Sequence, residues 1–394
     1  MPVTALLSGH FCYNKIVSGE IALYIHVPFC CRKCRYCSFV SYAGRGVDMP
    51  LYLRALAAEM KQRAGGERVR TIYLGGGTPS LLPADAIGGV LSLVDTLFTV
   101  DKDAEISMEA NPGTVDGAYL ATVRRLGINR LSLGVQSFSD AELTLLGRIH
   151  TAAQAVEAVR LARDAGFANI NLDLIYGLPG QALADWRRSL EAALALAPEH
   201  LSLYALTLDE DTPLFREIQE GRLPEIDPDL AAEQYELAED LLSADGYDHY
   251  EISNWARPGR ACRHNLVYWN NEPYLGVGVA AHSCLDGRRF ANDVSLDGYL
   301  QAFSGHALPT SALDEEITPA LELAESAILG LRLGQGLDLA SLRRRFGVDV
   351  VSLYREPIAE MTAAGLLERY DGRLRLTRRG RLLSNEVFWR LLPD

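Results

Sequence analysis

Short apolar runs alternate with longer amphipathic segments from residue 20 to about residue 207. The runs are rich in Val, Ile, Leu and Tyr, a composition typical of strands that are buried on both faces of a parallel sheet. Strands are expected at residues 21–27, 69–74, 104–109, 129–135, 170–176 and 200–206. Six β-α units in succession predict an α/β fold built as a partial (β/α)6 barrel.

The segments between these strands carry helix signals. Residues 50–64 begin at a proline, which is favoured in a first helical turn, and are followed by Gly65-Gly66 as a stop. Residues 83–98 repeat the pattern of a proline start and one apolar face. Both segments are therefore expected to be helices.

The last part of the chain follows a different pattern. An Asp371-Gly372 pair between two short runs is a strong signal of a β-hairpin. A further helix is expected after the hairpin, and the helices before it are expected near residues 318–333, 338–346 and 349–364. Helices followed by a two-stranded wing predict a small winged-helix-like domain.

These patterns divide the chain into four parts. Residues 208–310 are less regular than the barrel and rich in aromatic residues and glycine, so they are expected to extend it. The predicted parts are an N-terminal extension (1–20), the barrel core (21–207), the barrel extension (208–310) and the C-terminal helical domain (311–394).

Composition and charge narrow the range of partners. The chain has 394 residues, 48% of them hydrophobic, which is enough for one large domain and a smaller one. Its formal net charge of -13 argues against nucleic acid as a partner, since phosphate binding needs surplus Lys and Arg. The first twenty residues lack the features of a secretory signal, and no apolar run is long enough to span a bilayer. We therefore expect a cytoplasmic protein that is not integral to a membrane.

Polar or glycine-rich residues follow each expected strand. The carboxyl ends of parallel strands converge on one mouth, where such folds place their chemistry. The groups at these ends are a cysteine-rich loop, the segment GGGTPS (75–80), Glu109, Gln136, Asp173 and Tyr204. Any one of them alone fits a turn or a satisfied buried polar group, but six in succession predict a site.

Four of the seven cysteines lie within the eight residues from Cys30 to Cys37. Clustered thiols in a reducing compartment favour metal or redox chemistry over disulfides. Cys30, Cys34 and Cys37 form a C-x-x-x-C-x-x-C set, which suits a 4Fe–4S cluster held at three of its four irons. Zinc bound by three cysteines and His26, and a redox pair at Cys34 and Cys37, are competing interpretations. Cys31 has no assigned role.

The cysteine set after the first strand and GGGTPS after the second together resemble the radical S-adenosylmethionine (SAM) superfamily. The resemblance implies that the open iron of a 4Fe–4S cluster binds SAM and that one electron then breaks a carbon–sulfur bond. It also implies that the glycine-rich turn exposes backbone groups to the methionyl part of SAM, an approach that side chains would block.

Further motifs resemble one group within this superfamily, which contains oxygen-independent coproporphyrinogen III dehydrogenase and the HemW-type heme chaperones. The motifs include YIHVPFC, EANPGT, INRLSLGVQSF, LGRIH and NLDLIYGLPGQ, and the resemblance covers about residues 20–390. It implies that the cluster is held by Cys30, Cys34 and Cys37. It implies a SAM pocket formed by Tyr24, Tyr36, Gly76, Gly77, Thr78, Glu109, Gln136, Arg148 and Asp173. Without the resemblance, the two carboxylates fit a buried polar network and the arginine fits a surface charge.

Three features favour the chaperone branch of this group. Phe39 stands where the dehydrogenase pattern has a further cysteine, and only 23 residues precede Tyr24. The segment HNLVYW (264–269) matches a motif associated with heme binding in HemW-type proteins. The match implies that His264 contributes to heme binding, with Tyr268 and Trp269 packed against the porphyrin.

The heme site has competing interpretations. Cys262 and His282 are lesser candidates for contact with heme. On chemistry alone, one histidine near aromatic residues fits a tied-down loop over a filled core better than it fits a heme ligand. His264 therefore depends on the resemblance for its assignment.

The resemblance as a whole implies a heme chaperone that binds heme, a 4Fe–4S cluster and SAM and transfers heme to an acceptor protein. The runner-up is oxygen-independent coproporphyrinogen III dehydrogenase, a radical SAM oxidative decarboxylase. A non-catalytic electron-transfer or zinc protein is a third option, and DNA binding by the basic segments 342–347 and 377–381 is disfavoured by the acidic balance. The expected partners are heme and a heme-acceptor protein, and a homodimer is compatible with this expectation.

Overall fold

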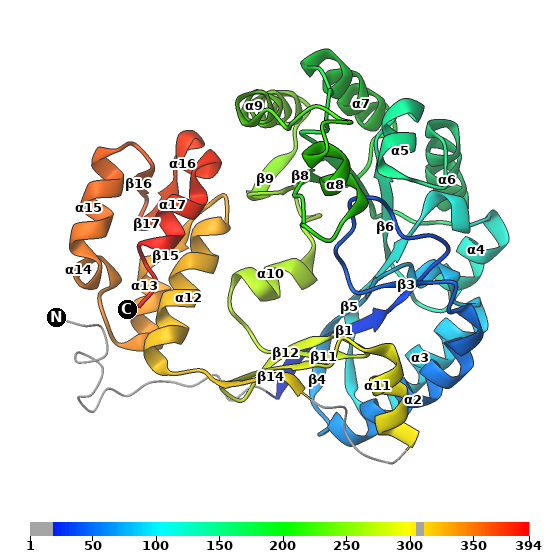
Figure 1. The fold of residues 1–394 in the computed structure, drawn as a ribbon. Helices are drawn as coiled ribbons and strands as arrows, with labels where there is room; N and C mark the ends of the chain where they lie inside the picture. The colour runs from blue at the N-terminus through cyan, green and yellow to red at the C-terminus, as the bar shows by residue number, and fades with distance from the viewer. Residues whose placement is uncertain (1–18, 305–310, 394) are drawn as a thin grey trace.

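The computed structural model describes residues 19–304 and 311–393. The predicted N-terminal extension therefore lies outside the described residues, apart from Gly19 and Glu20. Figure 1 shows a large curved sheet wrapped in helices and a smaller domain beside its open side. The residue boundaries of the four predicted parts stay predictions. Within the described ranges, no helix has both the length and the apolar character needed to cross a membrane.

Six parallel strands form the centre of a 12-stranded sheet and follow one another in chain order. They are β1 (Glu20–Val27), β4 (Arg68–Gly76), β5 (Thr99–Ala110), β6 (Arg130–Gln136), β7 (Ile170–Tyr176) and β8 (His200–Ala205). Each of the six predicted strands is found, although β5 begins at Thr99 rather than at residue 104. The sheet curves without closing (Figure 1), so the predicted partial barrel is confirmed.

Helices on the outside of the sheet connect these strands. They are α2 (Met49–Arg63), α3 (Ala84–Leu97), α4 (Gly117–Arg125), α5 (Asp140–Leu146), α6 (Ala152–Asp164) and α7 (Leu183–Ala195). Thr151 and Gln154 form the reciprocal capping box that starts α6. Gly147 ends α5 in the left-handed conformation that glycine tolerates best. The two predicted helices, 50–64 and 83–98, are confirmed as α2 and α3.

Short strands extend both edges of the sheet. Next to β1 lie β11 (Tyr274–Val277), which is parallel to it, and then the antiparallel β12 (His282–Leu285), β13 (Arg288–Asn292) and β14 (Ser311–Glu316). Next to β8 lie β10 (Asn254–Ala256) and β9 (Asp248–Glu251). The helices in this part are α8 (Pro213–Gln219), α9 (Pro228–Ala244), α10 (Arg263–Trp269) and α11 (Leu296–Ser304). The sequence analysis did not predict these strands, which are three to six residues long and lie outside the regular succession of β-α units.

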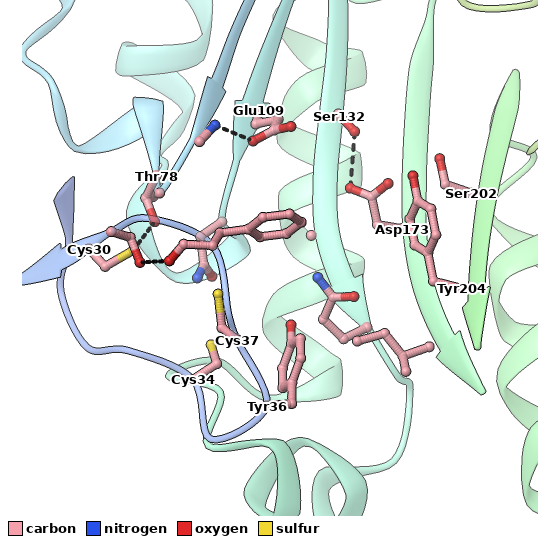
Figure 2. A pocket seen from close by; sticks show the side chains of 18 of the residues that line it. Cys30, Cys34, Tyr36, Cys37, Thr78, Glu109, Ser132, Asp173, Ser202 and Tyr204 are labelled. Atoms are coloured by element: carbon pink, nitrogen blue, oxygen red, sulfur yellow. Dashed lines mark hydrogen bonds between the residues drawn. The ribbon is translucent and has the colours of Figure 1, made fainter. Parts of the chain in front are cut away.

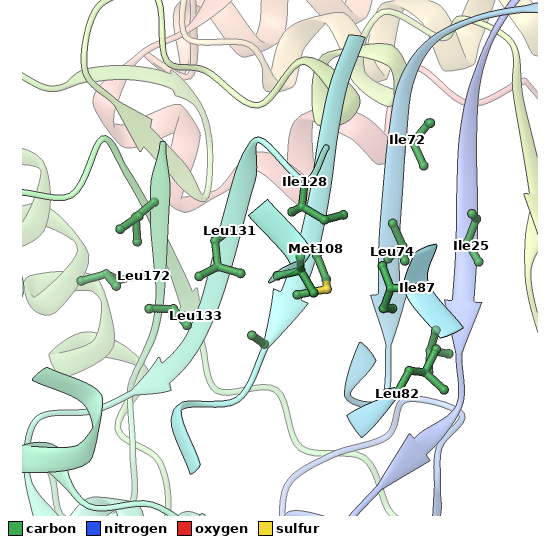
Figure 3. Close-up of a cluster of buried hydrophobic side chains, with 14 of the residues drawn as sticks. Ile25, Ile72, Leu74, Leu82, Ile87, Met108, Ile128, Leu131, Leu133 and Leu172 are labelled. Atoms are coloured by element: carbon green, nitrogen blue, oxygen red, sulfur yellow. The ribbon is translucent and has the colours of Figure 1, made fainter. Parts of the chain in front are cut away.

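The central strands alternate between apolar residues that face the helices and polar residues that face the interior. Leu131 and Leu133 of β6 and Leu172 of β7 belong to the apolar cluster in Figure 3. Ser132 and Asn171 lie between them in the sequence and therefore point to the opposite face. Both faces are buried, as predicted, but the inner face is polar.

The C-terminal domain has its own apolar core. Its elements are α12 (Pro319–Arg332), β15 (Leu337–Asp338), α13 (Leu339–Phe346), α14 (Val350–Leu353), α15 (Arg355–Ala363), β16 (Leu367–Tyr370), β17 (Arg373–Leu376), α16 (Arg378–Leu382) and α17 (Ser384–Trp389). The hairpin β16–β17 turns at Asp371 and Gly372, whose φ angles of 47° and 72° suit the tight turn that the sequence predicts. The winged-helix-like prediction is thus confirmed, except that the helix expected at 349–364 is interrupted at Tyr354.

The basic segments of this domain contact the barrel. Arg378 pairs with Asp240 of α9 at 2.7 Å, and Arg381 pairs with Glu239 of the same helix at 2.7 Å. Arg345 donates a hydrogen bond of 3.1 Å to the carbonyl of Asn271, which follows α10. These arginines belong to the basic segments that suggested DNA binding. In the structure they join the C-terminal domain to the barrel.

Candidate functional site

Three cysteines of the loop after β1 face one cavity at the carboxyl ends of the central strands. Cys30 ends the short strand β2 (Phe29–Cys30), which pairs with β3 (Tyr42–Ala43) and folds the loop back on itself. Figure 2 shows Cys30, Cys34 and Cys37 around the same space. Cys31 is exposed. The loop therefore brings together the three cysteines that the spacing singled out.

This loop is held against the turn that follows α5. The Arg35 amide donates to the last carbonyl of that helix at 3.0 Å. Arg32 Nη2 donates to the carbonyls of Gly147 and Arg148, both at 2.8 Å. In return, Arg148 Nη1 lies 3.2 Å from Cys34 Sγ. The thiols are thus fixed relative to the far half of the barrel as well as to β1.

The arrangement of the thiols bears on which metal centre they suit. Across the described part of the chain, no three His, Cys, Asp or Glu side chains lie close enough to hold a single metal ion. His26, the fourth ligand in the zinc interpretation, bonds to Tyr24 Oη through Nδ1 at 3.0 Å and to the Val40 carbonyl through Nε2 at 2.9 Å. The zinc interpretation therefore lacks its fourth ligand in this conformation.

The glycine-rich turn after β4 passes directly behind Cys30. A Cβ added at Gly77 would lie 2.7 Å from a carbonyl oxygen of the cysteine loop and 3.1 Å from Cys30 Sγ. Gly76 has a φ of 117°, and a Cβ there would meet the His26 ring at 2.6 Å. Thr78 Oγ1 donates to Cys30 Sγ at 3.6 Å. Only residues without side chains allow this approach of turn and loop.

Two carboxylates face the cavity, Glu109 from β5 and Asp173 from β7. Glu109 accepts hydrogen bonds from Tyr73 Oη at 3.0 Å and from the Gly76 amide at 3.1 Å, and Asp173 accepts one from Ser132 Oγ at 3.0 Å. Burial, and then the charge of Asp173, raises the pKa of Glu109 to about 7. Burial also raises the pKa of Asp173. Buried acids of this kind favour a positively charged ligand, which would restore their ionised forms.

One cavity of about 510 Å³ is lined by most of the predicted cofactor residues. It brings together Cys30, Cys34, Tyr36, Cys37, Gly76, Gly77, Thr78, Glu109, Gln136, Arg148 and Asp173. Gln136 adopts a φ of 69°, an uncommon conformation for a residue other than glycine and one found at functional sites. Tyr24 lies behind the lining, with its ring stacked on Tyr73 at a centroid distance of 6.2 Å. His264 is also outside the lining.

His264 lies on α10, which occupies the open side of the barrel in Figure 1. Its buried ring bonds to Thr71 Oγ1 through Nδ1 and to Tyr268 Oη through Nε2, both at 2.9 Å. Burial, and then the charges of Arg130 and Arg70, lowers the pKa of His264 to about 3. The imidazole is therefore neutral near pH 7, and both of its nitrogens have partners in this conformation.

The rest of the HNLVYW motif reaches both edges of the open barrel. Asn265 forms a hydrogen bond with the side chain of Tyr250 on β9. Tyr268 packs edge-on against Tyr274 of β11 at a centroid distance of 4.8 Å. The helix α10 thus bridges β9 and β11 across the open side of the barrel, and the motif has a structural role in this conformation.

The other residues considered for heme lie in separate environments. Cys262 is buried 3.4 Å from Glu105 Oε1, and burial raises the pKa of its thiol to about 12. His282 is exposed on β12. The Trp269 ring lies 4.3 Å from the guanidinium carbon of Arg332 in the C-terminal domain. The cavity of about 510 Å³ is lined by none of these three side chains.

The inner floor of the cavity was missed by the sequence analysis. It is formed by Arg130, Ser132, Asn171, Ser202 and Asn265. Four of the five come from the starts or middles of central strands, away from the strand ends on which the prediction relied. The signal was nevertheless present in NRLSLG and INLDL, where polar and apolar residues alternate with a period of two.

Similarity to known proteins agrees with this geometry. Residues 24–193 match the model of the radical SAM superfamily, and residues 317–383 match that of the HemN C-terminal domain. The chain is 40% identical over 376 residues to the heme chaperone HemW of Mycobacterium tuberculosis, with 94% of each chain covered. It is 34% identical over 375 residues to the heme chaperone HemW of Bacillus subtilis, covering 94% of this chain and 99% of that protein.

A solved structure shares most of the fold. Coproporphyrinogen III oxidase (HemN) from Escherichia coli, described as a radical SAM enzyme, superposes with a TM-score of 0.83. The two chains are 26% identical, and the match covers 95% of this chain and 90% of the other.

The raised pKa of Glu109 predicts how stability depends on pH. The folded ligand-free protein favours the protonated acid, so this stabilisation is present below the ordinary pKa of 4.5 and is lost as the pH rises through about 7. Glu109→Gln removes the titration. Between pH 5 and pH 8 the free energy of unfolding should therefore fall by about 2 kcal/mol less in the variant than in the parent. Urea unfolding at a series of pH values measures the free energy of unfolding. Glu191→Gln, at an exposed site, is the control and should behave like the parent. Parallel pH profiles of stability for Glu109→Gln and the parent would contradict the prediction.

Proposed function

Because the chain belongs to the HemW family of radical SAM proteins, we propose that it is a heme chaperone that binds a 4Fe–4S cluster, SAM and heme and transfers heme to an acceptor protein. The observation that carries the proposal is the placement of three cysteines, a glycine-rich turn and two carboxylates around one cavity. The chaperone name borne by relatives that match nearly the whole chain supports it.

Cys30, Cys34 and Cys37 would hold the cluster. The donor set supports this assignment, because the three thiols come from one loop and surround a space that a Cβ at Gly77 would narrow. Arg148 places a positive charge beside Cys34 and would offset part of the negative charge of the bound thiolates. When bound, the cluster would supply an open iron and an electron.

The rest of the mouth would hold SAM. The residues proposed to form its pocket are Tyr24, Tyr36, Gly76, Gly77, Thr78, Glu109, Gln136, Arg148 and Asp173. Gly76 and Gly77 bring backbone groups to the ligand, and Tyr24 supports their turn from behind. Glu109 exchanges its proton near pH 7 and, once ionised, attracts the cationic end of the ligand.

Heme would bind at the HNLVYW motif with His264 as the iron ligand. Neutral imidazole is the form that ligates iron, and His264 is neutral near pH 7. Thr71 on β4 and Tyr268 on α10 itself occupy the two ring nitrogens, so a movement of α10 away from β4 would free Nδ1 for the iron and leave Nε2 bonded to Tyr268. Tyr268 and Trp269, on the same helix, would then pack against the porphyrin.

The proposal also covers location and partners. Free thiols that hold a cluster need a reducing compartment, so we place the protein in the cytoplasm. Its partners would be heme and a heme-acceptor protein, and a homodimer is compatible with the proposal. Nucleic acid has no part in it, since arginines of the basic C-terminal segments are used in contacts with the barrel.

The cysteine assignment predicts which thiols are needed for the cluster. After anaerobic reconstitution, the parent should hold about four iron and four sulfide per chain. Cys30→Ala, Cys34→Ala and Cys37→Ala should each hold far less, because each removes one of three attachments. Cys31→Ala is the matched control from the same loop and should keep the full content. Full content in any of the three variants, or its loss in the control, would contradict the assignment.

The heme assignment predicts that His264→Ala weakens heme binding by about 10-fold and shifts the Soret band, because an iron ligand is lost. Spectrophotometric titration with heme measures both. His282→Ala, which removes an exposed imidazole, should change neither. An unchanged band and affinity in His264→Ala would remove His264 from the site.

The runner-up function, oxidative decarboxylation of coproporphyrinogen III, is favoured by the superposition on HemN. Phe39 is 69% exposed at the position where the dehydrogenase pattern has its further cysteine. We expect the reconstituted protein, given SAM, a reductant and coproporphyrinogen III, to form no decarboxylated porphyrinogen. Chromatography of the oxidised porphyrins checks this, and turnover to a product with fewer carboxyl groups would select the enzyme instead.

A further inference from the structure

Arg130, the first residue of β6, lies at the floor of the cavity beneath the residues assigned to SAM. The side chain is 2% exposed. Considering residues 19–304 and 311–393, no carboxylate lies within ion-pair distance of its guanidinium, no hydrogen bond reaches it, and its Nε is buried without a partner. Glu105 attracts Arg130 electrostatically but makes no ion pair with it. A carboxylate at hydrogen-bonding distance would therefore complete the surroundings of the unpaired guanidinium donors.

The groups around Arg130 are already engaged. Asn171 Nδ2 donates to Ser132 Oγ at 2.7 Å and to Asp173 at 2.8 Å. Glu105, an acid whose charge Arg130 senses, accepts the Arg263 and His264 amides at the start of α10, both at 3.1 Å. Arg130 is therefore the floor residue whose donors are left for a ligand.

We propose that Arg130 binds a carboxylate group of a ligand that enters the cavity from its mouth. A guanidinium pairs with a carboxylate through two parallel hydrogen bonds, a geometry that amides and hydroxyls do not reproduce. Arg148 is a poorer partner, because it already donates to Cys34 Sγ at 3.2 Å and to the Gly134 carbonyl at 2.6 Å.

The inference rests on the proposed function, which names two ligands with carboxylates. SAM carries one at its methionyl end, and heme carries two propionates. Both sources present the same chemistry to Arg130, so ligand analogues that lack the carboxylate separate them.

The test compares affinities in the reconstituted full-length protein. Heme is compared with its dimethyl ester, and SAM with decarboxylated SAM. For one pair, the parent should prefer the carboxylate form by about 10- to 100-fold. Arg130→Gln should abolish that preference for the heme pair or lower it for the SAM pair, in which the open iron also binds the carboxylate. Arg130→Lys should retain more of it, and Arg187→Gln, at an exposed site on α7, should leave it unchanged.

The outcomes separate the two proposals. If Arg130→Gln weakens the preference for the carboxylate form only with heme, Arg130 binds a propionate. If it weakens that preference only with SAM, Arg130 binds the methionyl carboxylate. Equal affinity of both forms in both pairs, or a preference that is undiminished in Arg130→Gln for both pairs, overturns the inference. If Arg130→Gln does not fold, Arg130→Lys supplies the comparison, and its preference should be weaker than that of the parent. Failure of the parent to bind heme or SAM at all would contradict the proposed function as well.

Discussion

The contact between the cysteine loop and the turn after α5 is the constraint on which the rest of the site depends. Arg32 and Arg35 bind the backbone of that turn, and Arg148 within the turn reaches back to the Cys34 thiol. The loop leaves β1 and the turn follows β6, so the contact spans the curved sheet. It fixes the thiols over the cavity before any ligand arrives, which is the preorganisation that a ligand site needs.

The helix on the open side of the barrel connects the cavity proposed for the cluster and SAM with the site proposed for heme. The helix α10 closes that side, and Asn265 of this helix lines the same cavity as the cysteines. His264, one residue earlier, is anchored on Thr71 of β4. A displacement of α10 that freed His264 for heme would therefore also alter the floor of the cavity. The C-terminal domain packs behind this helix, with Arg345 on the carbonyl of Asn271.

Position along the strands explains what the sequence could reveal. Glu109 and Asp173 were predicted because parallel strands must bring their carboxyl ends together, whatever the contacts between them. Gly77 was predicted because a cysteine loop and a glycine turn at neighbouring strand ends must pass close by. The succession of β-α units likewise allowed the partial barrel to be predicted. The Asp371-Gly372 turn signal allowed the C-terminal hairpin to be predicted.

Long-range contacts explain what the sequence could not reveal. The burial of His264 depends on Thr71, which lies 193 residues away along the chain, and no local pattern encodes that pairing. The edge strands β11 and β10 likewise depend on β1 and β8, which are remote in sequence, whereas β12 with β13 and β9 with β10 are local hairpins. Arg130 had a local signal in the polar alternation of β6, but its lack of a partner is visible only when every surrounding acid has been placed.

The central claim is that three thiolates leave one iron of a cluster open to SAM. Electron–nuclear double resonance of the reduced protein, loaded with SAM labelled with ¹⁵N in its amino group and ¹⁷O in its carboxylate, tests this most directly. The account predicts resolved couplings from both labels to the cluster spin. A cluster that binds SAM without any coupling to either label would contradict it.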